Sequence, residues 1–179
     1  MELTKVEVNK ALVLKAVTTK QLNVKRVCYV SRKPFREILE VLDAGIGHPN
    51  MEELWRNIFK ANTVAEVDDL MRSTAGPSGL IEFLRFNHGD IVHKGKMGGM
   101  PGIIRLVVGN PSIMRRMAEH VPDGGSYAPV TILIDERLDG VHLSYDRVAS
   151  FLATYKNEEA LKVARELDAK VEGLLASID

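Results

Sequence analysis

The sequence predicts an α+β fold in which an antiparallel sheet carries its helices on one face. Short segments rich in β-branched and aromatic residues follow one another in pairs, without the strict strand–helix alternation typical of parallel sheets. The dipeptide Asp139-Gly140, a strong signal for a two-residue hairpin, joins the last two of these segments. Both observations indicate strands that pair through hairpins.

The predicted strands are apolar runs or alternating segments bounded by turn residues. In chain order they cover residues 4–17, 22–30, 80–88, 103–108, 129–135 and 141–145, with a short partner strand at 91–93. Residues 95–102 form a glycine-rich segment, GKMGGMPG. Because it lacks the Gly-Lys-Ser/Thr ending of a phosphate-binding loop, we expect a long hairpin loop or a lid over a pocket.

Helix starts are marked by side chains that can accept hydrogen bonds from the first helical turn. The first predicted helix begins near Pro34 and ends before Gly45. A helical pair at about 50–73, which we interpret as an insertion, has two capping boxes, Asn50 with Glu53 and Thr63 with Glu66. The predicted caps of the three later helices are Asn110, Asp146 and Asn157.

The composition is that of one soluble globular domain spanning residues 1–179. The 24 basic and 24 acidic residues give a net charge of zero, which argues against nucleic-acid binding and makes self-association easy. The single cysteine, Cys28, rules out an internal disulfide and indicates a cytoplasmic location. No apolar run approaches the roughly 20 residues that span a bilayer, so we expect no membrane partner.

Three segments carry a family resemblance. The Gly-Asn-Pro step at 109–111, the apolar strand that ends at Asp135-Glu136, and Leu-Ser-Tyr-Asp at 143–146 resemble domain-of-unknown-function family 302, over roughly residues 22–179. The resemblance implies a β-α-β-β-β-β-α core similar to half of a TATA-box-binding protein, and a homodimer. It implies no activity, because the family has no general one.

Polar side chains inside the strands at 80–88 and 103–108 mark the candidate functional region. Strict alternation places Glu82 and Phe86 on one face of the first strand and Arg85 on the other. Arg85 and Arg105 lie on strands expected to be neighbours, and if their faces coincide they can hold a carboxylate or phosphate. The alternative is that these arginines form ion pairs with Glu82, Asp135 or Glu136.

His88 is the candidate general acid–base residue, and we group it with Arg85 and Arg105 as catalytic. The candidate ligand-binding residues, which surround these three or lie near strand ends, are Phe86, His93, Tyr127, Tyr145 and Met97. The spacing of His88 and His93 matches no standard metal signature, so we predict no metal site and no cofactor. A haem or metal ion bound through His88 is the lesser alternative.

These observations favour a small-molecule-binding domain whose pocket lies beside the strands at 80–88 and 103–108. One alternative is an enzyme (a lyase, isomerase or hydrolase) that uses His88 as acid–base and arginines to hold an anionic substrate. Another alternative is a structural or protein-interaction module that binds a partner through the helical pair at 50–73.

Overall fold

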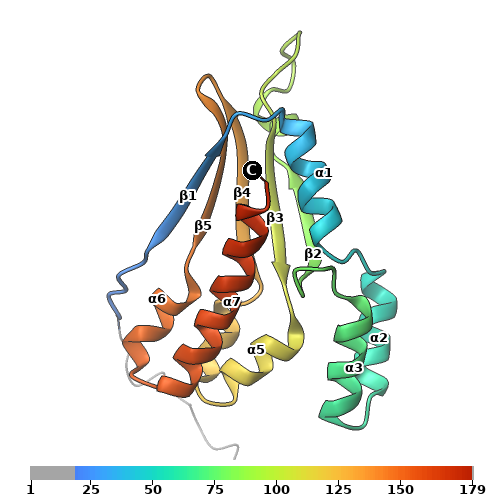
Figure 1. Cartoon of the computed structure of the whole chain (residues 1–179), viewed down its shortest axis with the longest axis vertical. Helices are drawn as coiled ribbons and strands as arrows, with labels where there is room; N and C mark the ends of the chain where they lie inside the picture. Colours follow the sequence, from blue (N-terminus) through green and yellow to red (C-terminus); the bar gives the residue numbers. More distant parts are fainter. Residues whose placement is uncertain (1–18, 179) are drawn as a thin grey trace, which may run out of the picture.

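Five antiparallel strands form a single sheet in the computed structural model, which describes residues 19–178 (Figure 1). The strand order is β1-β5-β4-β3-β2. The strands are β1 (Arg26–Ser31), β2 (Ile81–Asn87), β3 (Ile103–Gly109), β4 (Val130–Arg137) and β5 (Gly140–Asp146). The predicted α+β class with an antiparallel sheet is therefore confirmed. The strand predicted at 4–17 lies outside the described residues.

Helices lie against one face of this sheet, with α7 crossing its middle (Figure 1). The helices are α1 (Phe35–Gly45), α2 (Met51–Lys60), α3 (Val64–Thr74), α4 (Gly89–Val92), α5 (Pro111–Ala118), α6 (Val148–Leu152) and α7 (Glu158–Ala176). A 3₁₀ turn at Pro122–Ser126 lies between α5 and β4, and another at Ala153–Tyr155 lies between α6 and α7. Among the described helices none is long and apolar enough to cross a bilayer.

Most predicted caps make the expected hydrogen bonds. Asn50 accepts one from the Glu53 N–H at 3.0 Å, and Thr63 accepts one from the Glu66 N–H at 3.2 Å. The side chains of Asn110 and Asn157 likewise accept from the first turns of α5 and α7. The helical pair predicted from these signals lies at α2 and α3.

The strand predicted at 91–93 is wrong, because this segment forms the short helix α4. The side chain of Asn87 accepts a hydrogen bond from the Asp90 N–H at 3.3 Å, and the His88 carbonyl accepts from the Val92 N–H at 2.9 Å. These local bonds close a helical turn before the β-branched residues Ile91 and Val92 can pair with another strand.

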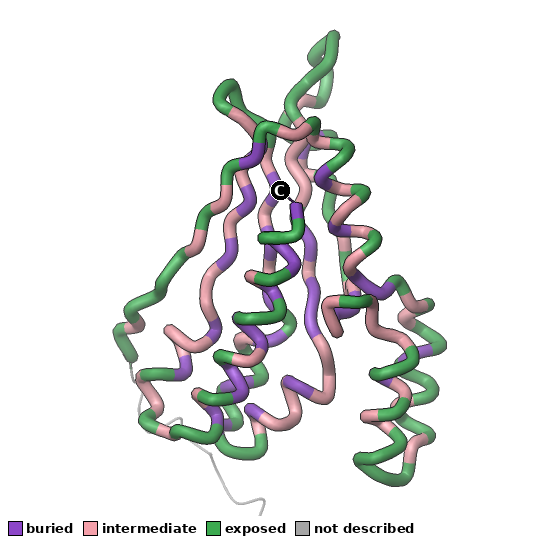
Figure 2. Tube along the Cα trace, viewed as in Figure 1, coloured by how far each residue is buried: buried purple, intermediate pink, exposed green. Residues whose placement is uncertain are grey.

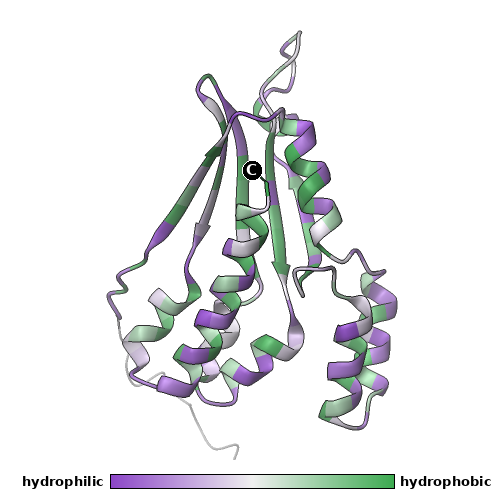
Figure 3. Cartoon of the chain, viewed as in Figure 1, coloured by the Kyte–Doolittle hydropathy of each residue, from purple (hydrophilic) through white to green (hydrophobic). Residues whose placement is uncertain are grey.

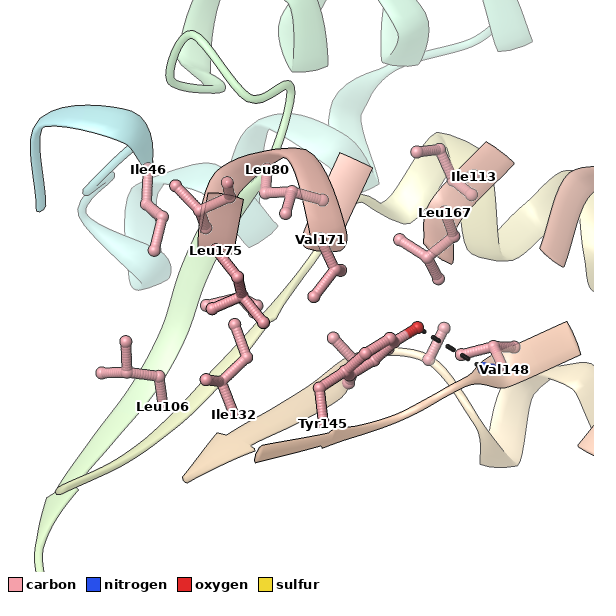
Figure 4. Packing of buried hydrophobic residues seen from close by; sticks show 14 of the residues in the cluster. Ile46, Leu80, Leu106, Ile113, Ile132, Tyr145, Val148, Leu167, Val171 and Leu175 are labelled. Carbon is pink, nitrogen blue, oxygen red and sulfur yellow. Dashed lines mark hydrogen bonds between the residues drawn. The ribbon is translucent and has the colours of Figure 1, made fainter. Parts of the chain in front are cut away.

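The main core lies between the helices and the covered face of the sheet (Figures 2 and 4). Alternate residues of each central strand point into it, and Ile132, Leu143 and Leu106 have no exposed surface. From the helical side, α7 contributes residues such as Leu167 and Val171, which are also fully buried. Hydrophilic and hydrophobic residues alternate along these elements (Figure 3), as expected for one buried face each.

The α2–α3 pair has a small core of its own, in which Leu54 and Met71 pack with Ile81 of β2. A backbone bridge between Gly47 and Ile81 fixes the start of this unit against the sheet. A Cβ atom on Gly47 would lie 2.2 Å from the Thr74 carbonyl oxygen. Glycine is therefore required where the chain enters and leaves the helical pair.

A buried polar cluster joins α7, β5 and α6. Asp168 of α7 accepts a hydrogen bond from the Tyr145 hydroxyl, and its two carboxylate oxygens accept from the N–H groups of Val148 (2.8 Å) and Ala149 (3.0 Å). The prediction that Asp146 caps this helix is wrong. Asp146 forms an ion pair with Arg26, and the more distant Asp168 serves as the cap.

Candidate functional site

The face of the sheet turned away from the helices carries a continuous row of side chains across all five strands. Strand register places Phe86 opposite Arg105, Arg105 opposite Leu133, Leu133 opposite Ser144, and Ser144 opposite Cys28. The neighbours of these residues along the strands, such as Leu106 and Ile132, point into the core. We call the surface that contains this row the open face.

An irregularity in β2 determines which of its side chains reach the open face. Glu82 is paired with Val108 and Leu84 with Val107, so Phe83 is an extra residue without a partner in β3. Such a bulge reverses the alternation on one side of it. Glu82 and Arg85 consequently share the covered face, and the strict alternation predicted for this strand is wrong.

Arg85 and Arg105 do not converge, because they lie on opposite faces of the sheet. Arg85 is paired with Leu106, which points into the core, whereas Arg105 is paired with Phe86 on the open face. The predicted joint anion site of the two arginines is therefore wrong. The reason is the register of β2 against β3. It differs by one residue from the register that would place Arg85 opposite Arg105.

Arg85 instead neutralises two carboxylates at the edge of the sheet. Its guanidinium forms an ion pair with Glu82, with a shortest N–O distance of 2.6 Å, and another with Asp43 of α1. These hydrogen bonds raise the pKa of Arg85 above its already high ordinary value. The ion pair with Glu82 agrees with the alternative stated from the sequence.

Asp43, His48 and Glu82 offer potential metal ligands that lie within 4.8 Å of one another. The His48 Nδ1 is 3.7 Å from Glu82 Oε2. Arg85 already provides a cation between the two carboxylates, and a metal ion placed there would be repelled by it. The cluster is accounted for as an ion-pair network.

A pocket of about 510 Å³ lies on the open face. Polar side chains from four strands and the turn before β4 line it together with aromatic rings. The lining residues are Arg26, His88, Arg105, Ser126, Tyr127, Pro129, Val130, Thr131, Leu133, Ser144, Tyr145, Asp146 and Phe151.

Arg105 supplies the uncompensated charge of this pocket. Its Nη2 donates a hydrogen bond to Thr131 Oγ1 at 3.2 Å, and its guanidinium carbon lies 5.9 Å from the centre of the Phe86 ring. Neither partner is acidic, and within residues 19–178 no carboxylate pairs with it. The other lining arginine, Arg26, is neutralised by Asp146 through two hydrogen bonds of 2.7 Å.

The chain matches the model of a family described as domain of unknown function DUF302 over residues 58–178. This chain belongs to the DUF302 family. It is also similar to the crystal structure of an uncharacterized conserved DUF302 protein from Bacillus stearothermophilus, with 10% sequence identity and a TM-score of 0.58. That match covers 86% of this chain and 98% of the other. Among curated proteins no match to this chain was found.

The resemblance inferred from the sequence is thus confirmed, and so is the fold that it implied for a DUF302 domain. The likeness of the core to half of a TATA-box-binding protein has no support in these comparisons and stays a prediction. Neither the family description nor the name of the similar protein from Bacillus stearothermophilus gives an activity, so function has to be argued from the pocket.

Of the residues singled out from the sequence of this DUF302 protein, His88, Arg105, Tyr127 and Tyr145 line the open-face pocket. Phe86 lies beside it, with its ring stacked parallel to that of His88 at a centroid distance of 5.8 Å. The structure does not bring Arg85, His93 or Met97 to this pocket. Arg85 lies on the other face, and Met97 is 96% exposed.

The two tyrosines differ in what they can offer a ligand. Tyr127 stacks on Phe151 at 4.7 Å, and its hydroxyl lies 3.0 Å from that of Tyr155. The Tyr145 hydroxyl points into the helical layer toward Asp168 and Val148 (Figure 4), and the residue is 1% exposed, so it offers no polar group to a ligand in the pocket. Burial and the neighbouring Asp168 carboxylate raise the pKa of Tyr145, which keeps this hydroxyl protonated.

Sequence reasoning missed Arg26, Thr131 and Ser144, which contribute polar groups to the pocket. Each lies next to a more buried position in its strand, so period-two alternation could have assigned them to the face opposite the core. What alternation could not give is the register that gathers them around Arg105.

Proposed function

We propose that this DUF302 protein binds a small anionic molecule in the open-face pocket, beside β2 and β3. The observation that carries the proposal is Arg105, a guanidinium without an acidic partner among the described residues, in a pocket that also presents hydroxyl groups. A volume of about 510 Å³ is within the ordinary range of small-ligand sites, roughly 300–1,000 Å³.

The charges lining the pocket favour a monoanion. Arg26 and Asp146 cancel each other, and Arg105 remains, which leaves one formal positive charge when His88 is neutral. A carboxylate can accept two parallel hydrogen bonds from one guanidinium. The hydroxyls of Thr131 and Ser144 lie on the same face as further hydrogen-bonding groups.

The pocket also offers walls suited to an apolar or aromatic body. The stacked rings of Tyr127 and Phe151 line it, together with Pro129. Aromatic walls bury large apolar areas with little loss of side-chain entropy. The ligand class that we propose is therefore a small carboxylic acid with an apolar or planar body.

A ligand-induced shift in melting temperature tests this proposal. We expect benzoate or a similar carboxylate to stabilise the wild-type protein and the Arg105→Gln variant to lose most of that shift, because Gln keeps hydrogen bonding and removes the charge. Arg36→Gln is the matched control, since the one ion pair of Arg36 within residues 19–178 is an exposed i,i+4 pair with Glu40. Equal shifts in wild type and Arg105→Gln would contradict the proposal.

Catalysis in the same pocket is the second candidate function. It is favoured by the position of His88, which lines the pocket together with Arg105. An imidazole can exchange protons near neutral pH, so His88 would act as acid–base on a substrate held by the arginine. If the enzyme hypothesis holds, His88→Gln abolishes turnover while carboxylate binding persists, and unchanged turnover excludes this role.

We further propose that the protein is a cytoplasmic homodimer. The support is the zero net charge, the unpaired thiol of Cys28, and the apolar side chains exposed on β1 and β2, where Val30 and Leu84 are each 49% exposed. Light scattering coupled to size-exclusion chromatography tests the stoichiometry, and a monomeric mass at micromolar concentration would refute the dimer.

A further inference from the structure

His93 has an unusual environment for a histidine that follows an exposed helix. Both ring nitrogens, Nδ1 and Nε2, are buried and have no hydrogen-bond partner in the described part of the chain. A neutral imidazole presents one donor and one acceptor, and burying such groups without a hydrogen-bond partner is unfavourable. An unsatisfied group of this kind indicates that something else interacts with the ring.

A small cavity of about 200 Å³ adjoins this ring, separate from the open-face pocket. Its lining includes His93 and Met100, together with Asn87, Asp90 and Phe35. The imidazole of His93, which precedes the glycine-rich loop, and the thioether of Met100, which lies within it, thus line the same small cavity.

The loop between them carries a second methionine. Met97 is 96% exposed, which is uncommon for an apolar side chain and gives it no packing role in the fold. Gly95 and Gly98 flank it with φ values of +81° and +103°, and a Cβ on either would have no atom within 4 Å. Because nothing packs against these glycines, the loop has room to bring Met97 toward the cavity.

We propose that His93, Met97 and Met100 form a binding site for a monovalent soft metal ion, Cu(I). The three residues have the spacing His-x3-Met-x2-Met. They supply one imidazole nitrogen and two thioether sulfurs, and thioethers select Cu(I) over harder ions.

The proposed site needs a movement of the loop that carries Met97. Met100 already lines the cavity with His93, so binding requires only the loop apex to fold back. The ion stays Cu(I) throughout, and no electron is transferred. The site is independent of the open-face pocket, and neither proposal depends on the other.

The test is an anaerobic titration of the full chain with Cu(I) in competition with bicinchoninate. It is run in wild type and in Cys28→Ser, because the exposed Cys28 thiol can itself bind Cu(I). We expect one equivalent of Cu(I) to remain bound in Cys28→Ser. In that background the double variant Met97→Leu, Met100→Leu and the single variant His93→Gln should each weaken binding by about tenfold or more.

Two substitutions serve as matched controls. Met51→Leu changes a methionine of α2, and His120→Gln changes an exposed histidine after α5; both should bind Cu(I) like the parent. Met97→Leu alone alters a 96% exposed side chain, so its effect on binding cannot come from misfolding. X-ray absorption of the bound Cu(I) should show sulfur neighbours.

The proposal is overturned if Cys28→Ser binds no Cu(I) in the competition, or if the methionine and His93 variants bind it as tightly as their parent. An absorption spectrum with nitrogen and oxygen neighbours alone overturns it as well. Ag(I), titrated in the same variants and followed by the NMR signals of the methionine methyl groups, provides a redox-inert check of the same ligands.

Discussion

At the scale of single residues, the two arginines predicted to act together have separate roles. Arg85 neutralises Asp43 and Glu82 on the covered side of the sheet, with only 29% of its side chain exposed. Arg105, one row away in the strand register, has Thr131 and Phe86 as its partners. One residue of offset in β2 therefore separates a structural arginine from a candidate ligand-binding one.

Asp168 leads to a prediction about pH. Burial raises its pKa above the ordinary range, although the hydrogen bonds from Tyr145, Ala149 and Val148 act in the opposite direction. A raised folded-state pKa contributes stability that is present below the unfolded-state pKa, about 3.9, and is lost as the pH rises through the folded-state pKa. We expect the free energy of unfolding of wild type, relative to Asp168→Asn, to fall as the pH rises from about 4 toward neutrality.

Urea denaturation of wild type and Asp168→Asn over this pH series measures the difference in their free energies of unfolding. The contributions of the other titrating groups cancel in this difference. Asp69→Asn is the control, since Asp69 is an exposed residue of α3 paired with Arg72, and its difference from wild type should not follow the same trend. A difference that rises with pH in Asp168→Asn would show that the hydrogen bonds to the carboxylate outweigh its burial.

At the scale of elements, local sequence signals predicted most helices. The features that they did not predict depend on contacts between elements. The capping boxes at Asn50 and Thr63 predicted α2 and α3 because the bonds involved span a few residues. The cap of α6 comes from Asp168, which is 20 residues away from Val148, and no local pattern could indicate it. The bulge in β2 likewise depends on pairing with β3.

Gly47 gives a test of how the helical pair is joined to the sheet. We expect Gly47→Ala to lower the free energy of unfolding by about 2 kcal/mol or more, because its Cβ would meet backbone atoms that cannot move independently. Gly173→Ala is the matched control. A methyl group added at Gly173 of α7 would have no atom within 4 Å, so alanine should leave stability unchanged or raise it by about 0.5–1 kcal/mol. Chemical denaturation distinguishes the two outcomes.

The α2–α3 pair contains both a buried side chain that packs in its core and an exposed aromatic side chain, and the two should differ in their effect on stability. Leu54 is buried in the small core, and Leu54→Ala should cost roughly 2–5 kcal/mol. Phe59 is 83% exposed although it stands near Trp55 at a ring distance of 6.4 Å, so Phe59→Ser should change stability by less than about 0.5 kcal/mol. Thermal melts of both variants check this. A large loss of stability in Phe59→Ser would show that the aromatic pair is part of the fold.

At the scale of the whole molecule, one face of the sheet holds the core and the other holds the candidate site. The helices cover the first face, and the open face keeps Arg105, Phe86 and the hydroxyl-bearing residues accessible. The cavity beside His93 shares no lining residue with the open-face pocket. The two proposed ligand sites can therefore be tested independently.

The sequence by itself determined the fold class, the family and the positions of most capped helices, and it named Arg105 and His88 as candidate site residues. These follow from periodicity and from bonds between neighbouring residues, which a linear pattern records. Only the tertiary structure decided that Arg85 lies on the covered face of the sheet, that Asp168 caps α6, and that Arg26, Thr131 and Ser144 line the same pocket as Arg105. Those outcomes depend on strand register and on contacts between distant segments, because a shift of one residue moves a side chain to the other face of a sheet.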